Sequence, residues 1–542
     1  MSHKKCENIL EARRANRIVE SAQTAESRFV ERHKENIEAT AKVFRTAYEC
    51  AQSHLPFSEH PRLIALQSLN GIQCGNILYS NHARSNIVAH ISSEMRSQIV
   101  NYVVQTGEKF SFMVDESTSV ANTQSMIVYI GTKLEDSVCT YFLALLEIED
   151  ASACGLEKTL VDFLHEIGFS EELLRNQFTA FCSDGASCMI GQHKGLATLL
   201  KSKYPQLHTF HCMAHRLELA VKNTVDTINA VSHFRIFVDE LYKVYSTSPK
   251  NQRELNSVSE TLCVELLKVQ KVFDARWVFS SFVAVKAVLR NFAALHQHFS
   301  ECASMDSARP SKEKRKYSSL ASKLQSWFFV AETCMLKDAL RCIKQLSLFL
   351  QSNNATIVDA VNHIDSLKSK LMAMKTENRT SLAKFFDSYN DEKQKHQYKC
   401  IEIVQNESDL DKFSKMRGQF LQSLIDNFEQ RFPYADFFTQ DAACLNPLSW
   451  PDDPLQKALF GERSVAKLCK GFGISSSEAA LTVVDYAVFK QSSGAVVGNA
   501  LKHLPKCLDV LPISSADCER GFSQMNLYHT SGRNRLLLNS CQ

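Results

Sequence analysis

Hydrophobic positions in the first hundred residues recur at helical spacing. Residues 1–55 interleave Arg, Lys and Glu with isolated Ile, Val and Phe, which predicts charged helices that end near Leu55-Pro56. A second helix is predicted over Ser85–Thr106, because an apolar residue recurs there every four positions, at Ile87, Ile91, Met95, Ile99 and Val103. We therefore expect an N-terminal helical arm over residues 1–106.

The hydrophobic period changes after Gly107. Three short runs rich in β-branched and aromatic residues predict an antiparallel meander of strands at Phe110–Val114, Ser125–Thr132 and Val138–Ile148. Helices and strands then alternate, with helices expected over Gly155–Gly168, Gly195–Lys203 and His211–Val225 and strands over Phe178–Cys182 and Leu207–Phe210. This order predicts an α/β or α+β sheet domain that occupies residues 107–231.

Strand-like runs nearly disappear between about Ser232 and Leu504. Amphipathic helices are expected over Phe279–Phe299, Leu320–Gln351, Ile357–Tyr389 and Phe413–Phe432. An internal loop is predicted over Ser304–Ser319, where Ser, Pro and a basic run break the pattern, and another break over Asn446–Pro454. We expect a helical body over residues 232–504, followed by a last segment over residues 505–542.

Composition narrows the class of protein. In 542 residues, Lys+Arg 62 against Asp+Glu 59 gives a formal charge of +3, so any nucleic-acid surface must be local. The polar N-terminus has no apolar signal core, and no stretch approaches the roughly 18–20 apolar residues of a membrane helix, so we expect neither secretion nor a membrane partner. The 18 cysteines contain no C-x-x-C pair and indicate reduced thiols in the cytosol or nucleus.

Two aspartates follow apolar strand sequences. Asp115 ends the apolar part of FSFMVDEST, and Asp184 follows TAFCS and precedes a glycine. Carboxylates at two strand ends can share a divalent cation, because hard cations take oxygen ligands. The alternative for each aspartate is a turn former or helix cap.

Two further groups have candidate chemistry. His211, Cys212 and His215 form H-C-x-x-H, which would place both imidazoles on one helical face and begin a zinc site if a third protein ligand were supplied. Packing and hydrogen bonding is the alternative that we favour. The run Lys312–Lys316 is either a nuclear-import signal, a phosphate-binding loop or a solvated surface loop.

Five motifs occur along the chain in the order FMVDESTS, FCSDGASCMIG, FHCMAHRLELA, DARW and LPISSADCERGFSQMN. This order resembles that of the hAT superfamily of transposases, in the vertebrate domesticated branch that includes BED-type and MYM-type zinc-finger proteins. The last motif is the most specific, since it resembles the small-residue-rich signature of the hAT C-terminal dimerisation region.

The resemblance implies a ribonuclease-H-like mixed sheet interrupted by a large all-α insertion. It places a metal-binding catalytic DDE triad on Asp115, Asp184 and Glu519, which would hold Mg²⁺ or Mn²⁺ for DNA strand cleavage and transfer. The gap of 335 residues (519 − 184) between the last two agrees with the helical block at 232–504. Trp277 resembles a tryptophan that stacks near a flipped base, and Arg276 suits phosphate; a core tryptophan is the alternative.

Several positions depart from the family pattern. Ser117 replaces the aromatic residue usual two places after the first aspartate, and no Cys/His constellation precedes residue 100. We expect that a BED-type finger was lost or that the chain is a fragment, and that the C-terminus is truncated, which would weaken homo-oligomer formation.

We therefore expect a domesticated hAT transposase-like nuclear protein that binds DNA and protein partners without efficient transposition. An active DDE transposase or nuclease and a SUMO-pathway ligase or adaptor are the alternatives.

Overall fold

The computed structural model describes most of the chain between residues 32 and 528. The described ranges are 32–118, 123–135, 137–191, 194–227, 229–270, 272, 277–352, 355–390, 396–432 and 441–528. Arg276, the first part of the expected N-terminal arm and the end of the expected dimerisation region lie outside the described residues.

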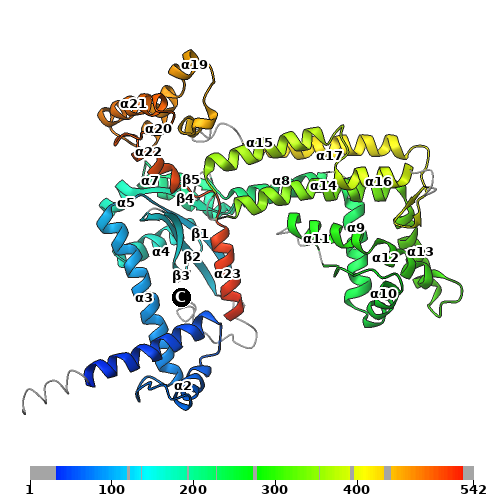
Figure 1. The fold of residues 1–542 in the computed structure, drawn as a ribbon, viewed down its shortest axis with the longest axis horizontal. Helices are drawn as coiled ribbons and strands as arrows, with labels where there is room; N and C mark the ends of the chain where they lie inside the picture. The colour runs from blue at the N-terminus through cyan, green and yellow to red at the C-terminus, as the bar shows by residue number, and fades with distance from the viewer. Residues whose placement is uncertain are drawn as a thin grey trace, which may run out of the picture.

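A five-stranded mixed sheet lies at the centre of the fold, in the order β3-β2-β1-β4-β5 (Figure 1). Its strands are β1 (Phe110–Thr118), β2 (Gln124–Leu134), β3 (Ser137–Glu147), β4 (Phe178–Ser183) and β5 (His208–His211). The first three form an antiparallel meander, and β4 and β5 add in parallel beside β1. The predicted fold class, a mixed sheet with a large helical part, is confirmed.

Each face of the sheet buries its own set of side chains, because successive residues of a strand point to opposite faces. Phe112, Val114 and Val128 pack with α3 (Asn81–Thr106), α4 (Ala153–Glu166) and α7 (Leu196–Lys203). Met113 and Cys182 belong to the core of the opposite face, which also contains residues of α8 (Met213–Thr227) and α23 (Ala516–Tyr528). The short helices α5 (Glu171–Gln177) and α6 (Ser187–Ile190) flank β4.

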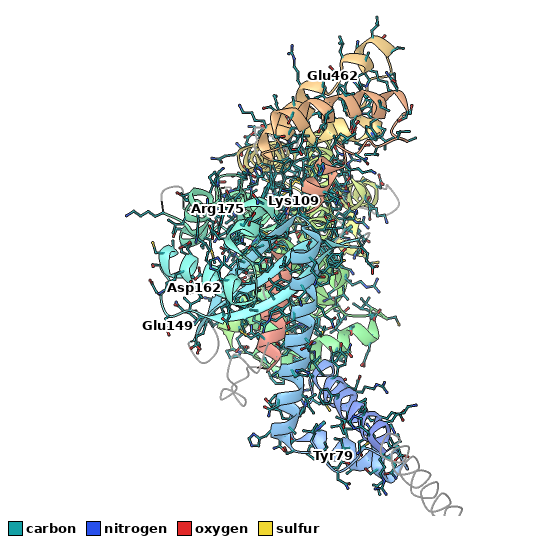
Figure 2. The ribbon with its side chains drawn as sticks, turned by 90° about the vertical axis from the view of Figure 1, so that its left-hand side faces the viewer. Tyr79, Lys109, Glu149, Asp162, Arg175 and Glu462 are labelled. Carbon is teal, nitrogen blue, oxygen red and sulfur yellow. The ribbon has the colours of Figure 1, made fainter. Side chains whose placement is uncertain are left out.

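The N-terminal arm is helical where it is described. Residues 32–52 form a helix, α2 (Glu59–Leu69) follows, and both pack with the first half of α3 through Val43, Ile64 and Ile87. In Figure 2, Tyr79 marks this part at one end of the molecule and Glu462 marks the helices after residue 453 at the other. The sheet therefore lies between two helical parts.

The helical body extends to one side of the sheet (Figure 1). Its elements are α9 (Asn229–Ser246), α10 (Pro249–Thr261), α11 (Trp277–Arg290), α12 (Phe292–Ala303), α13 (Ser311–Gln325), α14 (Trp327–Leu350), α15 (Ile357–Ala373), α16 (Thr380–Asn390), β6 (Gln397–Tyr398), β7 (Ile401–Glu402) and α17 (Asp409–Arg431). The helices predicted over 279–299, 320–351 and 357–389 are each two helices. The first is broken at Asn291, whose buried side chain bonds both backbone groups of Leu267.

The loop predicted over Ser304–Ser319 is wrong from Ser311 onward, where α13 begins. The helix has an apolar face of four residues that are buried at helical spacing, Tyr317, Leu320, Ala321 and Leu324. In the sequence, the basic run in the first turns of the helix hides this pattern. Lys312, Arg315 and Lys316 lie on its exposed first turns. The run is therefore part of a solvated helix.

The chain returns to the sheet after a last group of short helices. These are η2 (Ala443–Leu445), η3 (Pro447–Ser449), α19 (Pro454–Leu459), α20 (Glu462–Gly471), α21 (Ser476–Gln491) and α22 (His503–Asp509). The segment 511–515 then joins the start of α8: the Met213 amide donates to the Ile513 carbonyl at 2.8 Å. This return places α23 against β1 and β2.

Among the described residues, no single helix is both long and apolar enough to cross a membrane. The pair α11 and α12 meets those criteria only when joined, and the two bend by 69° at their junction.

Candidate functional site

Asp115 lies on β1, and Asp184 directly follows the end of the neighbouring parallel strand β4. In the ladder between β1 and β4, Met113 pairs with Cys182, an offset of 69 residues (182 − 113). Asp115 and Asp184 have the same offset (184 − 115) and lie two residues beyond that pair. Because residues two apart share a face of a strand, Asp115 lies on the face that buries Met113 and Cys182. Burial raises the pKa of the Cys182 thiol on that face, and the negative charges of Asp115 and Asp184 both raise it too.

The surroundings of Asp115 differ in one respect from the sequence prediction. Strand β1 does not end at Asp115 but continues to Thr118, because β2 pairs with it as far as Gln124. On the β4 side, pairing has already ended at Met113. The aspartate therefore lies inside an antiparallel ladder on one side and at an open sheet edge on the other.

Glu519 reaches this part of the fold from the opposite end of the sequence. It lies in the first turn of α23, which packs on β1 and β2 at Gly521. A Cβ atom at Gly521 would lie 2.3 Å from Ile127 Cδ1 and 2.7 Å from the Tyr129 hydroxyl, so the absent side chain permits the close approach. Ile127 is the cross-strand partner of Asp115.

The pKa of Asp115 responds to the charges of Asp184 and Glu519, so the three carboxylates lie in one neighbourhood. The pKa of Asp115 is raised from 3.8 to about 7 by burial first and then by the negative charges of Asp184, Glu519 and Glu116, against a hydrogen bond from the Glu116 amide that lowers it. Like charges this close disfavour ionisation. We call Asp115, Asp184 and Glu519 the acidic site.

Both aspartates also make the local bonds expected of turn formers. Asp115 Oδ1 accepts from the Glu116 amide at 2.9 Å, and Asp184 Oδ1 accepts from the Ala186 amide at 3.1 Å. The local bonds are those of the turn-former alternative, and they occupy one carboxyl oxygen of each aspartate.

Sequence reasoning missed Glu116 as a fourth acid beside this site. Burial raises its pKa, and so does the charge of Asp184, while a hydrogen bond from Cys188 lowers it. The Cys188 thiol lies 3.3 Å from Glu116 Oε1. The adjacent acids in VDES were the available signal, but strand alternation argued that Glu116 points to the other face.

His211 borders Asp184 from the neighbouring strand. It is the last residue of β5 and pairs with Ser183, so the predicted helical i,i+4 relation to His215 is wrong, although the two rings lie 5.6 Å apart. A Cβ at Gly185 would lie 2.8 Å from His211 Nε2. Burial, together with the charges of His215, Arg216 and Arg431, lowers the pKa of His211 to about 4.

The H-C-x-x-H motif does not bring together a zinc ligand set among the described residues. The Cys212 thiol instead lies 3.5 Å from the Ser514 hydroxyl and accepts from the Ser515 amide at 3.3 Å. These two contacts hold the segment 511–515 against the junction of β5 and α8.

Trp277, the expected DNA-stacking residue, is 3% exposed and belongs to the core of the helical body. It begins α11, where the Val278 amide donates to Glu218 Oε2 of α8 at 3.1 Å. The burial of Trp277 agrees with the alternative of a core tryptophan, because a ring this buried offers no face on which a base could stack. Its expected companion Arg276 is outside the described part of the chain.

The last motif also packs within the chain. Ile513, Ser515 and Cys518 are buried, so this part of the dimerisation-like signature holds α23 on the sheet. The continuation after Tyr528 is not described.

A family comparison covers the first part of the sheet domain. Residues 67–195 match the family model DUF4371. Its description is "ZMYM1/FAM200, RNase-like domain". The DUF4371 match includes Asp115 and Asp184 and ends before Glu519. This segment is similar to a ribonuclease-like domain, which supports a domesticated transposase-like protein.

Proposed function

We propose that this chain is a domesticated hAT transposase-like nuclear protein that binds divalent cations and nucleic acid at the acidic site, without efficient transposition. The single observation that supports the site is the raised pKa of Asp115, to which Asp184 contributes from 69 residues away (184 − 115) and Glu519 from 404 residues away (519 − 115).

The residues fit a pair of hard cations. The three residues are half-buried, and a divalent ion stabilises carboxylates that repel one another. The three acids are not a group whose ligand atoms all lie within 4.8 Å. In a two-ion arrangement, Asp115, Asp184 and Glu519 would hold the ions between them. Bound Mg²⁺ or Mn²⁺ would supply the activation of water and the stabilisation of a leaving oxygen.

Basic groups next to the acidic site support a nucleic-acid ligand. The charges of His215, Arg216 and Arg431 act on His211, which contacts the Gly185 position beside Asp184. Guanidinium groups bind phosphate oxygens and position a nucleic acid without reading its sequence. The exposed residues Lys312, Arg315 and Lys316 of α13 support nuclear import.

The second candidate is an active DDE strand transferase or nuclease, favoured by the presence of all three acids. Ser117, in place of the aromatic residue of the resembling family, favours the inactive form. Homo-oligomer formation through the C-terminal region remains part of the proposal.

Manganese titration of the full chain tests the site. We expect Mn²⁺ binding by calorimetry or paramagnetic resonance, and a loss of affinity of at least tenfold in Asp115→Asn. Asp162→Asn, an exposed acid on α4, is the matched control and should bind as the wild type does. Equal binding by wild type and Asp115→Asn would contradict the proposal.

Cleavage separates the two candidates. A labelled DNA hairpin incubated with protein and Mn²⁺ should stay intact. Cutting that disappears in Asp184→Ala would instead establish the active enzyme.

A further inference from the structure

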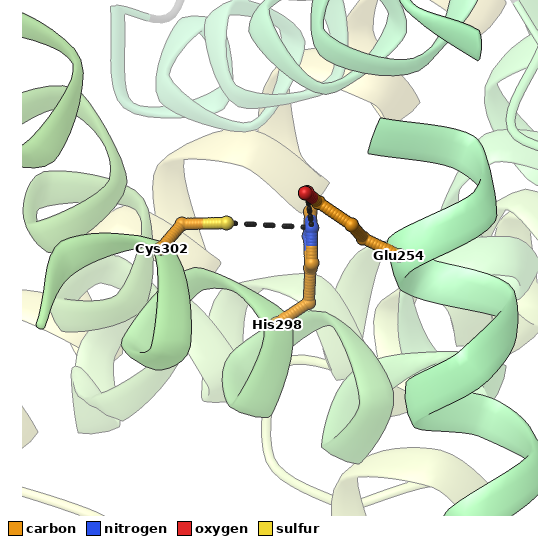
Figure 3. Close-up of side chains that lie close together, drawn as sticks. All are labelled: Glu254, His298 and Cys302. Atoms are coloured by element: carbon orange, nitrogen blue, oxygen red, sulfur yellow. Dashed lines mark hydrogen bonds and ion pairs between the residues drawn. The ribbon is translucent and has the colours of Figure 1, made fainter. Parts of the chain in front are cut away.

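A polar cluster in the helical body, far in sequence from the acidic site, combines three metal-binding residue types. Glu254 lies on α10, and His298 and Cys302 lie one turn apart on α12. Figure 3 shows the three side chains converging from the two helices. Their ligand atoms all lie within 4.8 Å of one another.

The individual distances match a tetrahedral ion. His298 Nε2 lies 3.3 Å from Glu254 Oε2 and 3.4 Å from Cys302 Sγ. Zinc bond lengths to nitrogen, oxygen and sulfur imply ligand-to-ligand separations of roughly 3.4–3.6 Å in a tetrahedron. The helices therefore already hold the donors at nearly the required spacing.

Neighbouring groups orient these donors. The Tyr245 hydroxyl lies 2.9 Å from His298 Nδ1. If Nδ1 carries the proton and donates it to the tyrosine oxygen, Nε2 is left with a lone pair that faces the cluster. Such a bond to the distal ring nitrogen is the usual support of a histidine ligand.

Among the described residues, two cations contact Glu254: the more exposed Lys250, 3.8 Å from Oε1, and Arg309, whose charge is matched by a second carboxylate. Its guanidinium donates to Glu254 Oε2 and, at 3.3 Å, to Glu313. A carboxylate oxygen has two lone pairs, so Glu254 can accept from Arg309 and also bind an ion. A thiolate and a carboxylate neutralise a divalent cation, and Glu313 neutralises Arg309.

Burial and access also suit a bound ion. His298 and Cys302 are 1% and 5% exposed, whereas the side chain of Glu254 is 35% exposed and gives a path from solvent.

We propose that Glu254, His298 and Cys302 form a zinc site with three protein ligands that ties α10 to α12, water completing the coordination. Zinc fits this mixed nitrogen, sulfur and oxygen set, whereas the hard cations expected at the acidic site prefer oxygen alone. This site is independent of the proposed nucleic-acid function.

Metal analysis of the full chain tests the proposal. We expect one zinc per chain that survives dialysis, and a thiolate-to-cobalt charge-transfer band after Co²⁺ substitution. Both should be lost in Cys302→Ser. They should persist in Cys263→Ser, which changes an exposed cysteine just after α10, and in Asp115→Asn, which changes only the acidic site.

A second variant keeps the test valid if Cys302→Ser fails to fold. Glu254→Gln alters the most accessible ligand and should lower zinc affinity at least tenfold while circular dichroism stays unchanged. A wild-type chain without zinc or the cobalt band, or a full band in folded Cys302→Ser, would overturn the proposal.

Discussion

Asp115 is the residue at which the fold and the proposed chemistry conflict most directly. Its pKa of about 7 lies well above its usual 3.8, so folding holds a proton on this carboxyl that the unfolded chain releases. As pH rises from about 4 to about 7, the unfolded chain loses that proton first and becomes relatively more favourable. The stability attached to this group therefore declines across that window.

We predict that Asp115→Asn gains stability over the wild type as pH rises, since asparagine cannot ionise. Each unit of pKa shift corresponds to 1.36 kcal/mol, which sets an upper limit of roughly 4 kcal/mol on the gain. Urea denaturation in chelator at pH 5 and pH 8 measures it. Asp162→Asn, at an exposed acid of α4, is the control variant. A pH-independent difference for Asp115→Asn would refute the assignment.

At the residue scale, the sequence could single out the aspartates of the acidic site but not the residues that surround them. Asp115 and Asp184 could be singled out because each follows an apolar strand sequence. Arg216 and Arg431 could not, since their relation to the acidic site depends on how α8 and α17 pack. Trp277 shows the converse: a motif suggested a ligand contact where packing buries the ring.

At the scale of elements, α23 positions Glu519 by lying directly on β2. The contact depends on a glycine at position 521, because the space beside the buried Ile127 is too small for any side chain there. Overpacking of this kind moves an element or strains its rotamers.

We predict that Gly521→Val lowers the free energy of unfolding by about 1–3 kcal/mol and weakens Mn²⁺ binding, because Glu519 moves with the helix. Calorimetric titration and urea denaturation measure the two effects. Gly418→Ala is the control: it lies within α17, where a Cβ would meet nothing within 4 Å, and should stabilise by up to about 1 kcal/mol. Unchanged Mn²⁺ affinity in folded Gly521→Val would contradict this role.

Strands and most helices could be predicted because their hydrophobic periods are clear. The breaks within long helices could not be located as well. Asn291 ends α11 through bonds to Leu267, a contact made in the folded chain. Ser326 separates α13 from α14 where the Trp327 amide bonds the Val404 carbonyl. Both breaks follow from tertiary contacts.

At the scale of the whole molecule, residues 511–515 join the two distant parts of the sheet domain. Ile513 is 5% exposed and its carbonyl bonds the start of α8. We predict that Ile513→Ala lowers the free energy of unfolding by about 2–5 kcal/mol and reduces Mn²⁺ affinity even where the protein stays folded.

The comparison for that prediction is Ile236→Ala, a 48% exposed isoleucine on α9. Its unfolding free energy should stay within about 0.5 kcal/mol of the wild type, and its metal affinity should be unchanged. A loss of stability in Ile513→Ala with full Mn²⁺ affinity would mean that the segment does not position α23.

The overall division into sheet and helical parts could be predicted from the change of hydrophobic period near residues 107 and 232. The return of Glu519 could not, because no local pattern specifies where α23 packs. Only the resemblance to the hAT family predicted that Glu519 lies near the aspartates. The pKa of Asp115, which the charge of Glu519 helps to raise, agrees with that prediction.

The return of α23 also sets an order of events during protein synthesis. Ribosomes add about 5–20 residues per second, so the 335 residues between Asp184 and Glu519 take roughly 17–70 s to translate. Throughout that interval the nascent strands lack the helix that covers Ile127 and Tyr129. This exposed apolar surface is where we expect chaperones to engage the growing chain.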